Sequence, residues 1–136
     1  MITQCQTQSF KVELCQAVHN FLTDTFKIAL YTGLANINVN TTVYTSVGEV
    51  VGTNYTAGGK TLTGATVAGA NGVAYISFNN ISWIPAGFTA RGALIYNSTK
   101  GNKSVAVLNF GSDKTGSPNF VVQMPTNTSA DALIRI

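Results

Sequence analysis

A cysteine and a histidine one helical turn apart are the side chains best placed for catalysis in this chain. Cys15 and His19 stand at positions i and i+4, so a helix would place them on one face. Such a pair can supply a thiolate nucleophile and its base where the setting is exposed and electropositive. Here the surrounding residues are apolar, and we expect Cys15 to be a buried thiol and His19 a structural residue.

The acidic residues show no spacing that indicates a catalytic or metal site. They are isolated from one another: Glu13, Asp24, Glu49, Asp113 and Asp131. Two of them could meet in space as an acid–base dyad, although no pattern favours this. The chain has no Gly-X-Ser-X-Gly elbow and no P-loop, and its two thiols with His19 are too few for tetrahedral zinc. We expect no catalytic, cofactor-binding or metal-binding residue, and no enzyme.

The composition suits a protein that binds a partner protein. The 136 residues suit a single domain spanning 1–136, and only 10% of them are charged, whereas soluble domains average about 25%. The net charge of +3 comes from scattered basic residues, so we expect no nucleic-acid partner. No apolar stretch approaches the ~20 residues of a membrane span. The first residues lack the features of a signal peptide, so we expect synthesis in the host cytoplasm.

One segment has the period of an amphipathic helix. Its apolar residues recur at steps of three and four: Phe10, Leu14, Ala17, Val18, Phe21 and Leu22. Thr7 or Ser9 could cap its start. The sequence therefore predicts a helix over 9–22, preceded by a polar leader over 1–8.

The rest of the chain has the alternation and turn spacing of short strands. The predicted strands are 26–31, 61–67, 73–78, 81–84, 88–97, 104–110, 119–124 and 132–136. Residues 34–42 are predicted to be a loop, and 43–51 fit either a helical turn or a strand. Asn71-Gly72 is a typical hairpin turn. The fold class is mainly β: an antiparallel, jelly-roll-like β-sandwich with one N-terminal helix.

Several segments together resemble small structural proteins of tailed bacteriophages. In order they are VHNF at 18–21, TDTFKIALY at 23–31, GEV at 48–50, YTAGG at 55–59, TARGALIYN at 89–97 and VAVLNFGSDK at 105–114. Within that family, the chain is most similar to capsid cement, or decoration, proteins with a jelly-roll fold.

The resemblance implies a location and a set of partners. Cement proteins bind the outside of the capsid and clamp neighbouring subunits of the major capsid protein, and the family has no catalytic residues. By this resemblance the chain is expected to be a virion protein on the capsid surface. It is also expected to be a homo-oligomer, because a homodimer or homotrimer supplies a bridging geometry.

The polar leader and the Asn-rich loop are the segments predicted to contact the capsid or another subunit. Both carry hydrogen-bonding groups and no evident core residue. Arg91 could bind a capsid carboxylate, although an ion pair within the sheet explains it equally well. The predicted contact residues are Gln4, Gln6, Asn36, Asn38, Asn40 and Arg91.

Two other functions fit the same sequence. The chain could be a tail, head-fibre or connector component of the virion. It could also be a carbohydrate- or receptor-binding β-domain, in which Trp83 or a tyrosine near a turn would stack on a sugar. The tyrosines near turns, Tyr31, Tyr44 and Tyr55, could instead lie at a subunit contact, where such residues are enriched.

Overall fold

The computed structural model describes all 136 residues as a mainly antiparallel β fold with one short helix, which confirms the predicted fold class. The elements in chain order are β1 (Cys5–Gln6), α1 (Gln8–Cys15), β2 (Phe26–Tyr31), β3 (Lys60–Thr61), β4 (Thr66–Ala70), β5 (Val73–Ser77), β6 (Ile81–Trp83), β7 (Phe88–Asn97), β8 (Lys103–Gly116), β9 (Phe120–Val122) and β10 (Ile134–Arg135).

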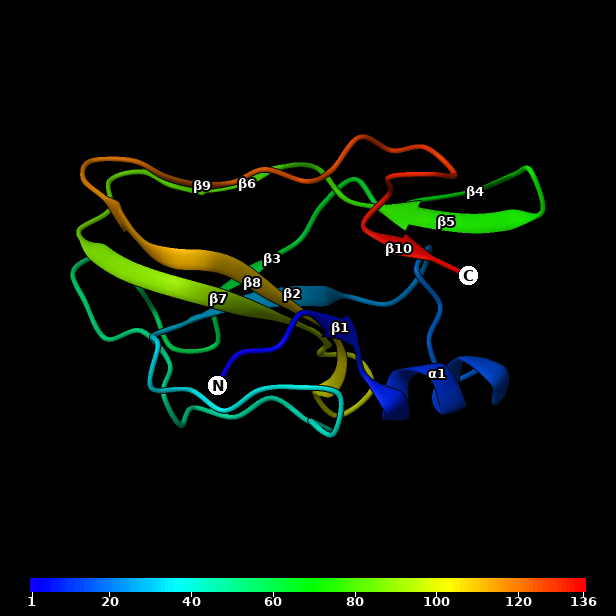
Figure 1. Ribbon diagram of the computed structural model, residues 1–136, viewed down its shortest axis with the longest axis horizontal. Coiled ribbons are helices and arrows are strands. Elements are labelled where there is room, and N and C mark those ends of the chain that lie inside the picture. Colours follow the sequence, from blue (N-terminus) through cyan, green and yellow to red (C-terminus); the bar gives the residue numbers. More distant parts are fainter.

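A five-stranded central sheet in the order β1-β8-β7-β2-β3 forms the middle of the molecule (Figure 1). Strand β2 pairs along its whole length with β7, and β7 with β8. Alternate residues of β2 face opposite sides: Ile28 and Leu30 join the larger apolar cluster, and Ala29 and Tyr31 a second one. Both faces of this sheet are therefore buried.

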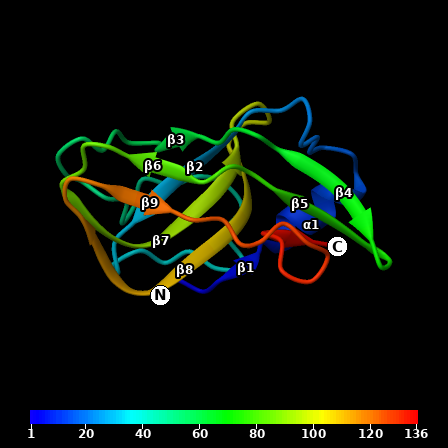
Figure 2. The same ribbon diagram turned by 90° about the horizontal axis from the view of Figure 1, so that it is seen from above.

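Two smaller sheets cover one face of the central sheet. One has the order β10-β5-β4, and the other pairs β6 with β9. Both belong to the upper part of Figure 1; in Figure 2, β6 and β9 lie over the central strands, and the β4–β5 hairpin extends beyond them. The larger core lies beneath them and contains Trp83, Phe88 and Phe120 in mutual aromatic contact.

Irregular chain covers the other face. Residues 32–48 run beneath the central sheet in Figure 1. Ala35 and Ile37 from this segment are fully buried together with Ile2, which bridges to Ile37. The prediction that the leader and the Asn-rich loop carry no core residue is therefore wrong, because both must supply apolar side chains to cover a sheet that is apolar on both faces.

The helix is shorter than the predicted 9–22. Thr7 caps α1 by accepting a hydrogen bond from the Phe10 N–H, and Gln16 is its C-cap. Ala17 then takes a left-handed conformation (φ 58°), which ends the helix. This turn brings Phe21 into the core, where it stacks on Phe26 at 4.5 Å between ring centroids.

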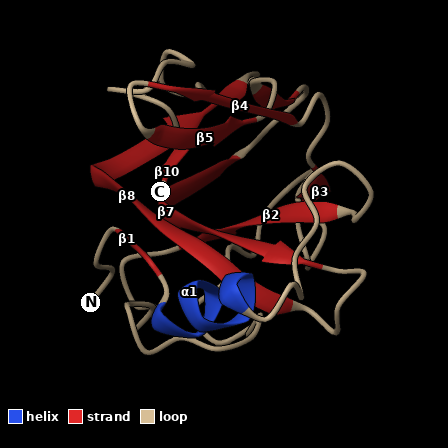
Figure 3. Ribbon diagram, turned by 90° about the vertical axis from the view of Figure 1, so that its right-hand side faces the viewer, coloured by secondary structure: helices blue, strands red, loops and turns tan.

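Two consequences follow from the early end of α1. Cys15 is exposed, so the prediction of a buried thiol is wrong. His19 lies beyond the helix and is buried. Figure 3 shows α1 below the central sheet and the β4–β5 hairpin above it. At eight residues, α1 is too short to cross a bilayer, and the structure has no other helix.

The strands differ from prediction mainly where a glycine changes the chain direction. The predicted strand 61–67 is divided into β3 and β4, with Gly64 at φ 68° between them. The predicted strand 104–110 continues to Gly116 as β8, in which an irregularity with Gly111 at φ 83° lets pairing with β7 resume. Asn71 and Gly72 both have positive φ and form the predicted hairpin turn between β4 and β5.

Candidate functional site

A groove of about 790 Å³ opens between the β1–β8 edge of the central sheet and the C-terminal segment of the chain. Its partly buried apolar side chains are Leu108, Phe110, Met124 and Leu133, all of which pack on the larger core. Its polar side chains are Gln4, Gln6, Asn109, Gln123, Asp131 and Arg135. The groove thus combines an apolar lining with a polar rim made mostly of amides.

Short strands hold the two walls of the groove. On one side, Cys5 and Gln6 in β1 pair with Val107 and Ala106 in β8. On the other side, β10 pairs with β5. The Gln6 amide donates a hydrogen bond of 3.1 Å to the Arg135 carbonyl oxygen and so joins β1 to β10. The N-terminal leader is therefore an ordered part of this site.

The groove offers hydrogen bonding with few ionised groups. Burial raises the pKa of the Cys5 thiol, although the charge of Lys11 acts to lower it. The raised pKa keeps the thiol protonated and weakly nucleophilic. The side-chain oxygen of Gln4 accepts a hydrogen bond from the Asn109 N–H at 3.1 Å. An apolar cleft with a few placed amides suits the binding of an uncharged segment whose main chain needs hydrogen-bond partners.

Of the predicted contact residues, only Gln4 and Gln6 are brought together at this groove. The Asn38 side chain donates to the Asn36 side-chain oxygen at 3.1 Å and accepts from the Asn40 N–H at 2.9 Å, so these three shape their own loop. Asn40 also lines a second hollow, of about 300 Å³, beside α1. Arg91 makes an exposed ion pair with Asp113 at 3.4 Å. This agrees with the interpretation of Arg91 as part of an ion pair within the sheet.

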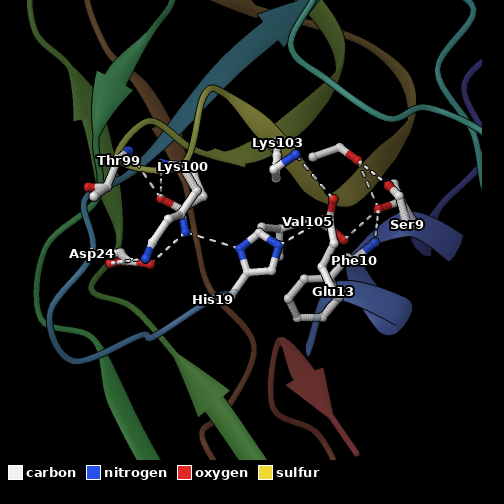
Figure 4. A network of polar contacts seen from close by, with 12 residues as sticks. Ser9, Phe10, Glu13, His19, Asp24, Thr99, Lys100, Lys103 and Val105 are labelled. Carbon is white, nitrogen blue, oxygen red and sulfur yellow. Dashed lines mark hydrogen bonds and ion pairs between the residues drawn. The ribbon is translucent and has the colours of Figure 1, made fainter. Parts of the chain in front are cut away.

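His19 lies in a buried polar network between α1 and the end of β7 (Figure 4). The Asn97 side-chain oxygen accepts hydrogen bonds from the N–H groups of Thr99 and Lys100. This fixes the Asn97 NH₂ group as the donor to His19 Nδ1, at 3.0 Å. His19 Nε2 is then the protonated nitrogen and donates to the Glu13 carboxylate at 3.0 Å. The ring is neutral in this arrangement.

The same network holds a second carboxylate. Asp24 Oδ2 accepts from the Asn97 NH₂ at 2.8 Å and from the Asn20 N–H at 3.0 Å. Burial acts to raise the Asp24 pKa, but these hydrogen bonds and nearby Lys100 outweigh it and lower the pKa. Cys15 is exposed and makes no hydrogen bond to His19, so the structure does not unite the suspected catalytic pair.

A tyrosine cluster around Glu49 is the feature that the sequence analysis missed. The buried Glu49 carboxylate accepts hydrogen bonds from the hydroxyls of Tyr44 (2.5 Å) and Tyr55 (2.6 Å) and from the Gly58 N–H (2.8 Å). The Tyr96 hydroxyl donates to the Gly58 carbonyl at 2.6 Å. The signal in the sequence was the lone acid of the GEV–YTAGG stretch, placed among tyrosines.

This cluster changes the ionisation of its phenols. Burial first, and then the Glu49 charge, raises the pKa of Tyr96 to about 12. Burial is also the largest cause of the raised pKa values of Tyr31, Tyr44 and Tyr55. Tyr31 is fully buried, and the hydroxyls of Tyr44 and Tyr55 donate hydrogen bonds to Glu49. These rings therefore serve the interior rather than a free surface.

The structure brings no three His, Cys, Asp or Glu side chains together as a metal site. Trp83, the aromatic residue considered for sugar stacking, is only 3% exposed. Comparisons with protein-family models, with curated proteins and with solved structures found no match for this chain.

Proposed function

We propose that this protein is a structural component of a bacteriophage virion, a cement or decoration protein that binds the outer surface of the capsid. Its partner would be the major capsid protein, and its role would be to hold neighbouring subunits together. The observation that supports this best is the apolar groove with its amide rim, into which the N-terminal strand brings Gln4 and Gln6. The sequence resemblance described above supplies the identity of the partner.

The physical basis of binding would be burial of apolar surface with little desolvation of charge. Leu108, Phe110, Met124 and Leu133 remain partly exposed around the groove. An extended segment of a capsid subunit could cover these side chains while its main chain bonds to the glutamine and asparagine side chains of the rim. Because the rim has few ionised groups, such a contact avoids the cost of burying unpaired charge.

Shell stabilisation would then follow from mass action. A protein that binds the assembled shell more tightly than dispersed subunits lowers the free energy of the shell in proportion to its occupancy. Each contact can be weak when many copies decorate one particle. No catalytic turnover is needed for this function.

The groove can be tested by its ability to bind shells. We expect Gln123→Glu and Met124→Glu to weaken cosedimentation of the purified protein with undecorated shells of its own particle by at least about tenfold, because each places an unpaired charge in an apolar contact. Gln123 is exposed, so its variant should fold normally. Leu22→Glu is the matched control, since Leu22 is 70% exposed and lies outside the groove.

The opposite result would be equally informative. Unchanged binding of a folded Gln123→Glu and Met124→Glu pair, together with a loss in Leu22→Glu, would place the contact surface elsewhere. Failure of the unaltered protein to bind any shell would count against capsid decoration and favour a tail, head-fibre or connector role, or a receptor-binding role.

A further inference from the structure

The outer edge of β4 is a free strand edge at one end of the molecule. In the order β10-β5-β4, strand β4 pairs with β5 on one side only, and all five of its residues are exposed. Figures 1 and 2 show the β4–β5 hairpin reaching the end of the molecule beyond the central strands. A free edge of this kind can pair with another strand.

The register of the hairpin shows which main-chain groups are free. Ala70 and Val73 flank the two-residue turn and are paired across it, as are Ala68 with Tyr75 and Thr66 with Ser77. These pairs direct their N–H and C=O groups toward each other. Val67 and Gly69, which alternate with them, direct theirs outward. In agreement, Ala74, opposite Gly69, turns its own N–H and C=O away from β4 to bond Ile136.

No other part of the chain occupies those outward groups. The C-terminal loop approaches the hairpin through side chains, with Asn127 bonding the Thr66 hydroxyl and Ser129 accepting from Asn71. Outside the β4–β5 ladder, no main-chain hydrogen bond involves Val67 or Gly69. The edge thus presents two N–H and two C=O groups in a row.

The usual protections of a free edge are missing from β4. Natural proteins place lysine, proline, bulges or very short strands at such edges to prevent pairing. Strand β4 has five residues and contains no proline and no charge, and the chain has no charged residue from 61 to 90. The other edge strands are shorter: β1, β3 and β10 have two residues each, and β6 and β9 have three. Strands β3 and β10 also carry Lys60 and Arg135.

We propose that β4 is the subunit contact of a homodimer, in which the β4 edges of two copies of this chain pair antiparallel about a two-fold axis. In the register that places Ala68 opposite its own copy, Val67 of each chain faces Gly69 of the other. Each such pair exchanges two main-chain hydrogen bonds, so all the free groups are satisfied. The two three-stranded sheets become one continuous sheet across the dimer.

A second copy is the occupant that the charge pattern favours. In a symmetric edge pair, every residue near the axis meets itself or a close neighbour, so a single charge there would face its like. An uncharged edge is what this geometry needs, whereas a partner with its own charges would be recognised better by complementary ones. The contact area of one strand pair is small, so the dimer is concentration-dependent.

The proposed dimer leaves the groove free. No residue of β4 lines it, and β10, which does, lies on the opposite side of β5. Two grooves on one dimer would give the molecule two binding sites for neighbouring subunits. The dimer itself rests only on the β4 edge and stands whether or not the protein decorates a capsid.

Sedimentation equilibrium of the purified chain without particles tests the proposal. We expect the mass to rise with concentration from the 14.3 kDa of one chain toward twice that value. Ala68→Lys and Ala68→Glu should each raise the dimer dissociation constant at least about tenfold, because like charges would face each other at the axis. An equimolar mixture of the two variants should dimerise again, because opposite charges then meet.

A control and a second variant keep the test decisive. Val51→Lys adds the same charge at a side chain that is 97% exposed and distant in sequence, and should leave the dissociation constant unchanged. Gly69→Pro removes an outward N–H without touching the β5 ladder, and should give a folded monomer. A wild-type chain that stays monomeric at about 1 mM, or folded Ala68 variants that dimerise as the wild type does, would overturn the proposal.

Discussion

Glu49 organises the loop that follows β2 without any cationic partner. The residue is 7% exposed, and its carboxylate accepts hydrogen bonds from two phenols and one main-chain N–H. Three short hydrogen bonds offset the cost of removing the charge from water. The residue thereby joins Tyr44, Tyr55 and Gly58, which lie in irregular chain with no ladder to fix them.

Replacement of Glu49 tests that role. We expect Glu49→Ala to lower the free energy of unfolding by roughly 3 kcal/mol, because three donors lose a charged acceptor. Glu49→Gln is the matched control and should cost about 1 kcal/mol, since its amide oxygen can still accept while Tyr44 reverses its hydroxyl. Urea denaturation measures both; equal losses would contradict the prediction, because they would show that an amide cannot take over the hydrogen bonds of the carboxylate.

The tyrosines around Glu49 predict a loss of stability at alkaline pH. Their pKa values are raised in the folded state, to about 12 for Tyr96, whereas the unfolded chain titrates near 10. The folded protein therefore keeps protons that the unfolded chain releases, and the free energy of unfolding falls as pH rises from about 10 to about 12. Below pH 10 this effect is absent.

Ultraviolet absorbance of phenolate during an alkaline titration measures this directly. The absorbance of the clustered tyrosines should rise together with loss of the folded circular-dichroism signal, while in urea all five tyrosines should titrate near pH 10. Ionisation of several tyrosines near pH 10 in protein that remains folded would contradict the structure of the cluster.

At the scale of elements, strands were predicted where alternation and turn residues agree. The bounds of β2 and β7 match prediction, because each strand is bounded by turn residues and buried over nearly its whole length. The predicted helix was too long because the apolar period continues through Ala17, Val18 and Phe21. A left-handed conformation at Ala17 separates Val18 and Phe21 from the helix. Phe10 in the helix and Phe21 beyond the turn are both buried in the same core, so the apolar spacing continues although the helix does not.

The candidate site was less accessible to sequence reasoning than the fold. Gln4 and Gln6 were predicted as contact residues from the polarity of the leader, and they do line the groove. The apolar side of the groove comes from Leu108, Met124 and Leu133, which are far apart in sequence and look like ordinary strand residues. The Asn97 network depends on long-range pairing with His19 and Asp24, which a local pattern does not contain. The partners of Glu49 are near it in sequence, but they lie in irregular chain, where no period indicates which side chains meet.

Strand β8 offers a direct test of the two-sided central sheet. Val107 is fully buried in the second cluster, so Val107→Asp should abolish cooperative folding by placing an unpaired charge there. Val121→Asp is the control: Val121 lies in the short strand β9 and is 49% exposed, and its variant should melt near the wild type. A soluble Val107→Asp protein with a normal thermal transition would show that the second apolar cluster of the central sheet is accessible to water.

At the scale of the whole molecule, the fold covers both faces of the central sheet and leaves two other surfaces available. The central sheet is sealed on one face by two small sheets and on the other by irregular chain from residues 32–48 and the N-terminal arm. What remains available is the groove beside β1 and the free edge of β4, on different sides of the β10-β5-β4 sheet. The proposed assembly role depends on these two surfaces.

The abundance of this protein in purified particles tests its proposed role in a virus shell most directly. Quantitative mass spectrometry of intact particles should find the protein in hundreds of copies, in fixed ratio to the major capsid protein. A dozen copies or fewer would identify a tail or connector component instead. Complete absence from washed particles would contradict the account of its function.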